Sequence, residues 1–221
     1  MKKIVLIFMS LIWFNTNGQS IVEEYKSLLL KKNTEEIEKV LRQRPRVHDT
    51  IPGNFNVFIN SYNIRIPMSN FKNQYDTYFQ LKRRIVSQVG DPMGNEEGIE
   101  YFSFYIGDLP TWTSDVCVEF FKEPWGDNYY FHKFQSTLPD YFIVINNKEL
   151  SDTLKVGMHL QELKEKFPIS YIMYEMRRNY SKTGKTEGSF FQVYHNWAFI
   201  NMKVDLNTNT VKVISYEPAE Q

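Results

Sequence analysis

The chain has 221 residues, with 26 basic and 26 acidic side chains and a formal net charge of +0. This balance argues against the basic surface by which proteins bind nucleic acid or an anionic membrane. Hydrophobic residues make up 42% of the chain and aromatic residues 16%, which is enough for a folded core. The composition therefore predicts a folded protein rather than a disordered one.

The first residues have the pattern of a secretory signal peptide. Lys2 and Lys3 precede an apolar run at 4–14 that is too short to span a bilayer comfortably. Small residues then mark a cleavage site before Gln19. We predict a signal peptide at 1–18, an exported bacterial protein (periplasmic or secreted), and no stable membrane insertion after cleavage.

Residues 19–46 are predicted to form a helical hairpin. Apolar residues recur at helical spacing in both halves, and Asn33 is placed to cap the second helix, with Glu36 as its capping-box partner. Pro45 ends the pattern. We expect this hairpin to precede the main fold.

Residues 55–135 are predicted to form a first α+β unit. Strands are expected at 55–59 and 64–66, followed by a helix from Ser69 through Val89. The apolar pattern then changes to that of short strands separated by turn residues, at 99–106, 116–121 and 129–134.

Residues 141–217 are predicted to form a second α+β unit. Its most regular stretch runs from Leu154 to Pro168: a strand, a turn at Gly157, and a helix whose apolar face carries three residues, Leu160, Leu163 and Phe167. Pro168 is expected to stop that helix. Strands are predicted before and after it, at 141–145, 170–176, 189–195, 197–204 and 211–216.

The two units share an order of elements, which predicts an internal duplication. In each unit a strand ends in Ile-Asn, at Ile59 and at Ile145, and a short apolar segment then leads to a Met before a helix, at Met68 and Met158. Both units continue into antiparallel strands. The predicted class is therefore α+β, with an N-terminal helical hairpin followed by two helix-on-antiparallel-sheet units.

The pattern from Leu154 to Phe167, with Gly157-Met158 before a helix and strands after it, resembles the unit of the SmpA/BamE outer-membrane assembly domain. The related β-lactamase inhibitor protein uses such a unit in tandem. The resemblance covers 141–217 and, in a more diverged copy, 55–135. It implies binding to another protein through the sheet, and it carries over no catalytic residues.

No motif for catalysis, a metal or a cofactor is complete in the sequence. Gly184-Lys185-Thr186 lacks the earlier glycine of a phosphate-binding loop, and no two of the four histidines have metal-ligand spacing. The single cysteine, Cys117, is predicted to be buried in a strand and inert. His132 or His195 would serve a hydrolase only if it lay in a cleft beside a carboxylate.

Surplus aromatic residues near predicted turns are the candidate binding residues: Trp112, Trp125, Tyr129 and Tyr130. Exposed aromatic rings provide rigid contact area for a protein or stack on sugars. Trp197 is instead expected in the core, because alternation places it on one face with Phe199.

The leading hypothesis is a non-catalytic, exported protein-binding module without a cofactor. The alternatives are a carbohydrate-binding module that uses the loop aromatics, and a histidine-dependent hydrolase.

Overall fold

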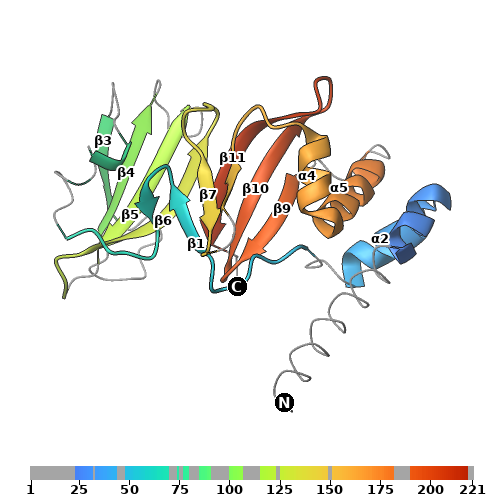
Figure 1. Ribbon diagram of the computed structural model, residues 1–221, viewed down its shortest axis with the longest axis horizontal. Helices are drawn as coiled ribbons and strands as arrows, with labels where there is room; N and C mark the ends of the chain where they lie inside the picture. The colour runs from blue at the N-terminus through green and yellow to red at the C-terminus, as the bar shows by residue number, and fades with distance from the viewer. Residues whose placement is uncertain are drawn as a thin grey trace, which may run out of the picture. The chain divides into compact units, whose positions relative to one another are not determined.

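The structure, a computed structural model of the chain, confirms the predicted α+β class (Figure 1). It describes residues 23–31, 33–43, 48–69, 74, 77–79, 85–90, 100–106, 115–122, 125–148, 151–181 and 190–218. The predicted signal peptide and Trp112 lie outside the described residues. Contacts divide the chain into two compact units, Met1–Asp49 with Gln161–Val193, and Thr50–Leu160 with Tyr194–Gln221. Each unit is described by itself below.

The first unit is largely helical. A helix at 23–31 and α2 (Thr34–Gln43) form the predicted hairpin, in which the backbone N–H of Glu36 donates to Asn33 Oδ1 at 3.4 Å. The predicted cap is therefore confirmed. The hairpin packs on α5 (Pro168–Ser181) through a cluster of five buried side chains, Tyr25, Ile37, Ile172, Met173 and Met176. No helix in the described part of the chain is long and apolar enough to cross a membrane.

The predicted strand at 170–176 is wrong, because this segment belongs to α5. Pro168 does follow the end of α4 (Leu160–Lys166), but it also begins α5, where its missing N–H has no cost. Asp49 caps the new helix: its Oδ2 accepts from the Ser170 N–H at 2.8 Å, and its own N–H donates to Ser170 Oγ at 2.9 Å. The segment resembled a strand because α5 is buried on more than one side, which removes the helical stripe.

Two antiparallel sheets dominate the second unit (Figure 1). The smaller has the order β2 (Tyr62–Asn63), β1 (Asn56–Ile59), β7 (Ile143–Asn146), β8 (Ser151–Leu154). The larger has the order β3 (Ile85–Gly90), β4 (Glu100–Ile106), β5 (Val116–Lys122), β6 (Tyr129–Ser136), β11 (Thr210–Pro218), β10 (Ala198–Asp205), β9 (Phe190–His195).

Two predicted elements near the start of this unit differ from the structure. The helix expected through Val89 is wrong at its end, because β3 occupies Ile85–Gly90, although residues 74 and 77–79 are helical. The β-branched residues of this segment favour a strand once β4 pairs with it. The strand expected at 64–66 is a turn, in which the Ile66 N–H donates to the Asn63 carbonyl at 3.1 Å.

Strand pairing has the symmetry that a duplicated unit produces. The sequence alignment of the two copies matches Ile59 with Ile145, and hence Val57 with Ile143. In the smaller sheet Val57 pairs with Ile145 and Ile59 pairs with Ile143, so exchanging the copies leaves the pairs unchanged. In the larger sheet β6 of the first copy pairs antiparallel with β11 of the second. The two predicted units therefore share both sheets.

The backbone contact between the corresponding Met of each predicted copy and the start of β6 or β11 is also repeated. Met68 forms a bridge with Tyr129 at the start of β6, and its carbonyl accepts from the Tyr129 N–H at 3.1 Å. The Met158 carbonyl accepts from the Val211 N–H near the start of β11 at 2.9 Å. The turn before Met158 uses Gly157 at φ 91°, a conformation that favours glycine.

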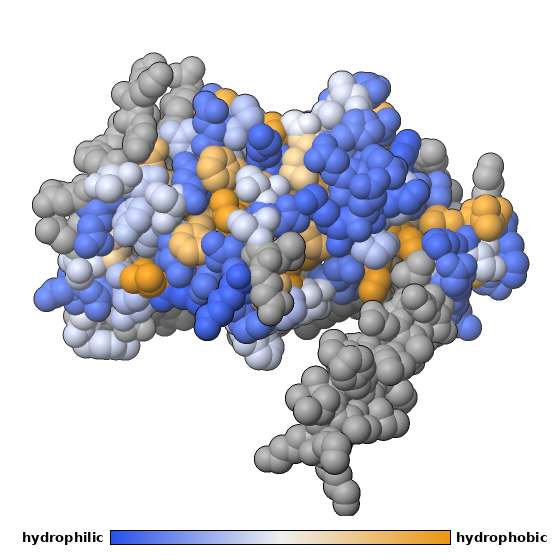
Figure 2. Space-filling model, viewed as in Figure 1, coloured by the Kyte–Doolittle hydropathy of each residue, from blue (hydrophilic) through white to orange (hydrophobic). Residues whose placement is uncertain are grey.

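An aromatic core joins the facing sides of the two sheets. Tyr62 of β2 contacts Phe120 of β5 and Phe131 of β6, with ring centroids 5.5 and 6.5 Å apart. Phe131 in turn contacts Tyr216 of β11 at 5.7 Å. On the outside, hydrophilic residues cover most of the described surface in the view of Figure 2, with small hydrophobic patches among them. This core fixes the strand ends that form the site below.

Candidate functional site

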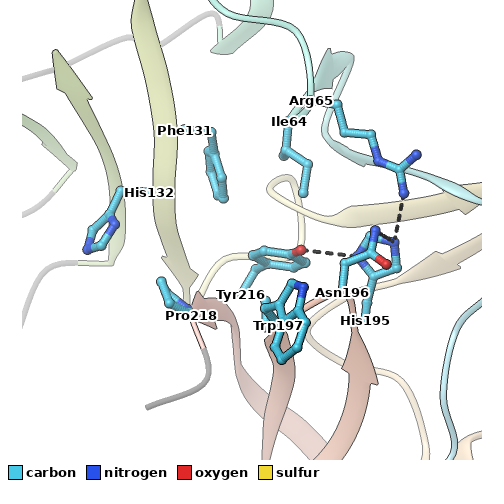
Figure 3. A pocket seen from close by; sticks show the side chains of 10 residues that line it. Ile64, Arg65, Phe131, His132, His195, Asn196, Trp197, Tyr216 and Pro218 are labelled. Carbon is cyan, nitrogen blue, oxygen red and sulfur yellow. Dashed lines mark hydrogen bonds between the residues drawn. The ribbon is translucent and has the colours of Figure 1, made fainter. Parts of the chain in front are cut away.

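A pocket of about 270 Å³ lies in the second unit, where β9, β10 and β11 meet the turn after β2 (Figure 3). It is lined by Ile64, Arg65, Phe131, His132, His195, Asn196, Trp197, Ala198, Tyr216 and Pro218. The pocket therefore combines apolar walls with a few polar groups, the usual composition of a binding site.

His195 is the buried polar centre of the pocket, with 1% of its surface exposed. Its Nδ1 lies 3.0 Å from the Tyr216 hydroxyl, and its Nε2 lies 3.4 Å from Asn196 Nδ2 and 3.5 Å from Arg65 Nη2. Arginine can only donate, so Nε2 is the acceptor and Nδ1 carries the proton. Burial, and then the charge of Arg65, lower the pKa of His195 against a weaker opposing effect of the Phe55 backbone. The imidazole is therefore neutral.

Tyr216 presents a hydrogen-bond donor to this pocket. Its hydroxyl oxygen accepts from His195 Nδ1–H, which leaves its own proton available. Burial raises the pKa of Tyr216 to about 12, so the phenol keeps this proton at neutral pH. In Figure 3 the Tyr216 ring lies between Phe131 and His195.

Arg65 holds a positive charge at the same place. Its Nη2 donates to the Gly53 carbonyl at 2.6 Å, which anchors the guanidinium. Within the described ranges no carboxylate lies in ion-pair distance of Arg65. Gly53 leaves room for this arrangement, because a Cβ there would lie 3.0 Å from Asn196 Oδ1.

Trp197 lies in a two-residue turn between β9 and β10 and is 79% exposed. Asn196 and Trp197 have φ angles of 42° and 62°, the pattern of a type I′ hairpin turn. Asparagine tolerates positive φ, whereas a bulky residue such as tryptophan is a genuine outlier. Backbone strain of this kind clusters at binding sites, so the solvent-exposed ring of Trp197 is a candidate binding group.

The expected core position of Trp197 is therefore wrong. Alternation continues only from Ala198, where β10 begins, so Ala198 and Ile200 are buried and Trp197 belongs to the turn. The site was missed in the sequence because its residues come from four separate segments. The only local signal was His195-Asn196 next to a tryptophan between two strands.

The predicted binding residues have different environments. Trp125 lies in the turn between β5 and β6 and is 82% exposed. Tyr129 and Tyr130 are half-buried on β6 and contact other strands of the sheet. Tyr129 meets Phe102 of β4 edge-on at 5.0 Å, and Tyr130 stacks on Phe121 of β5 at 5.4 Å. Trp112 is outside the described residues. Trp125, Tyr129 and Tyr130 are not among the residues that line the pocket.

Trp125 and Trp197 nevertheless lie at the same end of the larger sheet. β6 begins at this end, because Phe134 pairs with Tyr216 in β11 and the strands run antiparallel. β10 begins there too, because Ala198 pairs with Pro218. The end of the sheet that holds the pocket therefore carries two exposed tryptophans.

A second polar cluster lies on β4, β5 and β6 around Glu119. Its Oε1 is 3.5 Å from His132 Nε2 and 3.3 Å from Lys133 Nζ, and its Oε2 accepts from Ser103 Oγ at 2.8 Å. Ser103 is completely buried, and its hydroxyl donates to the carboxylate rather than to the imidazole. Burial lowers the pKa of His132, with Glu119 acting against it and Lys133 adding to it. This arrangement lacks a reachable nucleophile paired with a base.

Metal and thiol chemistry gain no support from the geometry. In the described part of the chain no three His, Cys, Asp or Glu side chains form a group that could hold a metal ion. Cys117 is half-buried on β5, and burial followed by the charge of Glu119 raises its pKa to about 12. Its sulfur is therefore a thiol at neutral pH.

No family model, curated protein or solved structure matches this chain.

Proposed function

We propose that this chain is an exported, non-catalytic protein-binding module. The observation that carries the proposal is Trp197, which is 79% exposed and lies in a strained conformation on the rim of a pocket. Such strain persists only where the surrounding structure over-determines it, and it clusters at sites that bind. Tryptophan is also among the residues that dominate binding energy in protein interfaces.

The surroundings of Trp197 favour binding over hydrolysis by His195. A histidine general base needs a partner that stabilises its charged form, whereas His195 faces the guanidinium of Arg65. That contact opposes protonation of the ring. The polar groups of the pocket are therefore arranged to donate hydrogen bonds to a ligand.

Two helices, α4 and α5, precede the strands of the second copy, and the copies share their sheets. The resemblance to the tandem β-lactamase inhibitor protein implies binding to another protein through the sheet. The shared sheets support this as the proposed mode, with the larger sheet as the binding surface.

The proposal is tested by affinity capture from the envelope extract of the source organism, read by mass spectrometry. We expect one protein to be captured in stoichiometric amount by the wild type and to be lost with Trp197→Gly. Arg42→Gln is the control, because Arg42 is an exposed residue of α2, which is not part of the sheet. Equal capture by all three proteins, or no capture, contradicts the proposal.

A carbohydrate-binding module remains the second candidate, because Trp125 and Trp197 are both exposed at one end of the sheet. Binding to a glycan array that disappears with Trp125→Ala and Trp197→Ala would favour it over a protein partner.

A further inference from the structure

We propose that the pocket around Arg65 binds a single carboxylate group, and that Trp197 covers the apolar group next to it. The inference rests on the proposed protein-binding function for the source of that carboxylate, which is the partner polypeptide. The juxtaposition that carries it is one anchored arginine, one free phenolic donor and one exposed indole around a small pocket.

The donors of the pocket match a carboxylate. Two contacts hold Arg65 Nη2, to the Gly53 carbonyl and to His195 Nε2, and so fix the direction of the guanidinium. Its Nε and Nη1 have no partner among the residues described. Tyr216 adds a hydroxyl whose acceptor side is occupied by His195. Arginine and hydroxyl donors together form the charge-assisted bonds that carboxylates prefer.

The charge of the pocket indicates a monoanion. Among the described residues that line the pocket, Arg65 is the one side chain with a permanent charge, and none is a carboxylate. His195 and His132 both have lowered pKa values, chiefly through burial, so neither adds a positive charge near neutral pH. A phosphate dianion would leave a charge uncompensated, whereas a carboxylate balances Arg65.

The walls of the pocket indicate what accompanies the carboxylate. Phe131, Ile64 and Pro218 are apolar, and the largely exposed Trp197 ring lines the pocket with them (Figure 3). The volume of about 270 Å³ is at the small end for a ligand site and suits one side chain or one chain end. The two possible polypeptide sources are a C-terminal carboxylate and an Asp or Glu side chain.

The test uses three libraries of synthetic pentapeptides on the immobilised protein, with retention read by mass spectrometry. One library has free C-termini and lacks Asp and Glu, the second is the same library amidated, and the third is amidated with one Asp or Glu. Glucuronic acid and glucose form a separate pair of probes, measured by NMR titration. The first and third libraries and glucuronic acid carry a free carboxylate, whereas the second library and glucose do not.

We expect retention of the first or the third library and not of the second, which identifies the source. Arg65→Gln should lower this retention at least about tenfold, and Arg65→Lys less, because lysine keeps the charge but not the planar fork. Arg42→Gln is the control, since Arg42 is an exposed arginine on α2. Melting curves of all variants establish that they fold.

The outcomes separate the two proposals. Retention that depends on Trp197 but not on Arg65, or equal retention of the amidated library, overturns the carboxylate inference and leaves the protein-binding function standing. Arg65-dependent binding of glucuronic acid without any peptide retention supports the carboxylate pocket and overturns the protein-binding function. Absence of binding to every carboxylate probe overturns the inference.

Discussion

Replacing Trp197 by glycine and by alanine tests whether the positive φ of this residue strains the backbone, which is the observation behind the proposed binding site. At φ 62° an L-residue pays roughly 1–2 kcal/mol relative to glycine. Glycine loses more conformational freedom on folding, by about 0.4–1 kcal/mol relative to alanine. We therefore expect Trp197→Gly to be more stable than Trp197→Ala by about 0.5–1 kcal/mol.

Comparison with the wild type alone is less informative. About a fifth of the Trp197 surface is buried, which is roughly 50 Å² for a ring of this size. Losing that burial costs about 1 kcal/mol, close to the strain that glycine relieves. The wild type and Trp197→Gly should consequently differ little in stability, while the alanine variant lies below both.

Trp125 provides the matched site, because it is equally exposed and is not among the described residues with positive φ. There we expect the opposite order, with Trp125→Ala more stable than Trp125→Gly by about 0.4–1 kcal/mol. Urea denaturation of the four variants measures both differences, and the melting temperatures at Trp197 should differ by roughly 1–4 °C. If alanine were more stable than glycine at both sites, the backbone at Trp197 would not be strained, and the main support for the proposed function would be lost.

Three further predictions concern the rest of the molecule. Gly157→Val should destabilise the folded state by about 1–3 kcal/mol. The cost is purely conformational, because the φ of Gly157 is 91° and a Cβ there would meet nothing within 4 Å. Gly126→Ala, at ordinary φ, should cost less than about 0.5 kcal/mol in the same urea denaturation series, and equal effects of the two substitutions would contradict the argument. Cys117 should react with a thiol reagent at pH 8 only after unfolding, because a pKa of about 12 leaves about one thiolate in 10⁴ molecules. Rapid labelling of the folded protein would show that the thiol is not held in its neutral form. The contribution of Asp49 to stability should fall as the pH rises from 3.8 through the raised pKa of its carboxyl group, because burial makes the folded state bind the proton more tightly than the unfolded state does. Asp49→Asn should remove this fall from the plot of unfolding free energy against pH, and an unchanged plot would contradict the prediction.

The sequence predicted those elements whose local signals agree with their packing. Asn33 caps α2 as expected, and the short strands with turn residues between them match β4 to β7 and β9 to β11. The turn between β10 and β11 is held by local contacts as well, with Asp205 Oδ1 accepting from the Asn207 N–H at 2.8 Å. In each case the residues that decide the conformation are neighbours in the chain.

The errors occur where distant residues decide the conformation. The segment 170–176 is helical because α2 packs on one side of it and Asp49, which is 121 residues away from Ser170, caps its start. Residues 85–90 form a strand through pairing with β4. The pocket could not be predicted for the same reason, since Arg65 and His195 are 130 residues apart.

In terms of the predicted duplication, the pocket occurs once and takes residues from both copies. A two-fold relation between β6 and β11 exchanges the two ends of the larger sheet, so corresponding connections leave at opposite ends. The connection that corresponds to the turn at Trp197 lies between β4 and β5 and includes Trp112, outside the described residues. Arg65 comes from the first copy, whereas His195, Trp197 and Tyr216 come from the second. The pocket thus requires both copies, because one copy would lack Arg65 and the other would lack Trp197 and Tyr216. On the proposed function, the tandem arrangement therefore completes a binding pocket as well as two sheets.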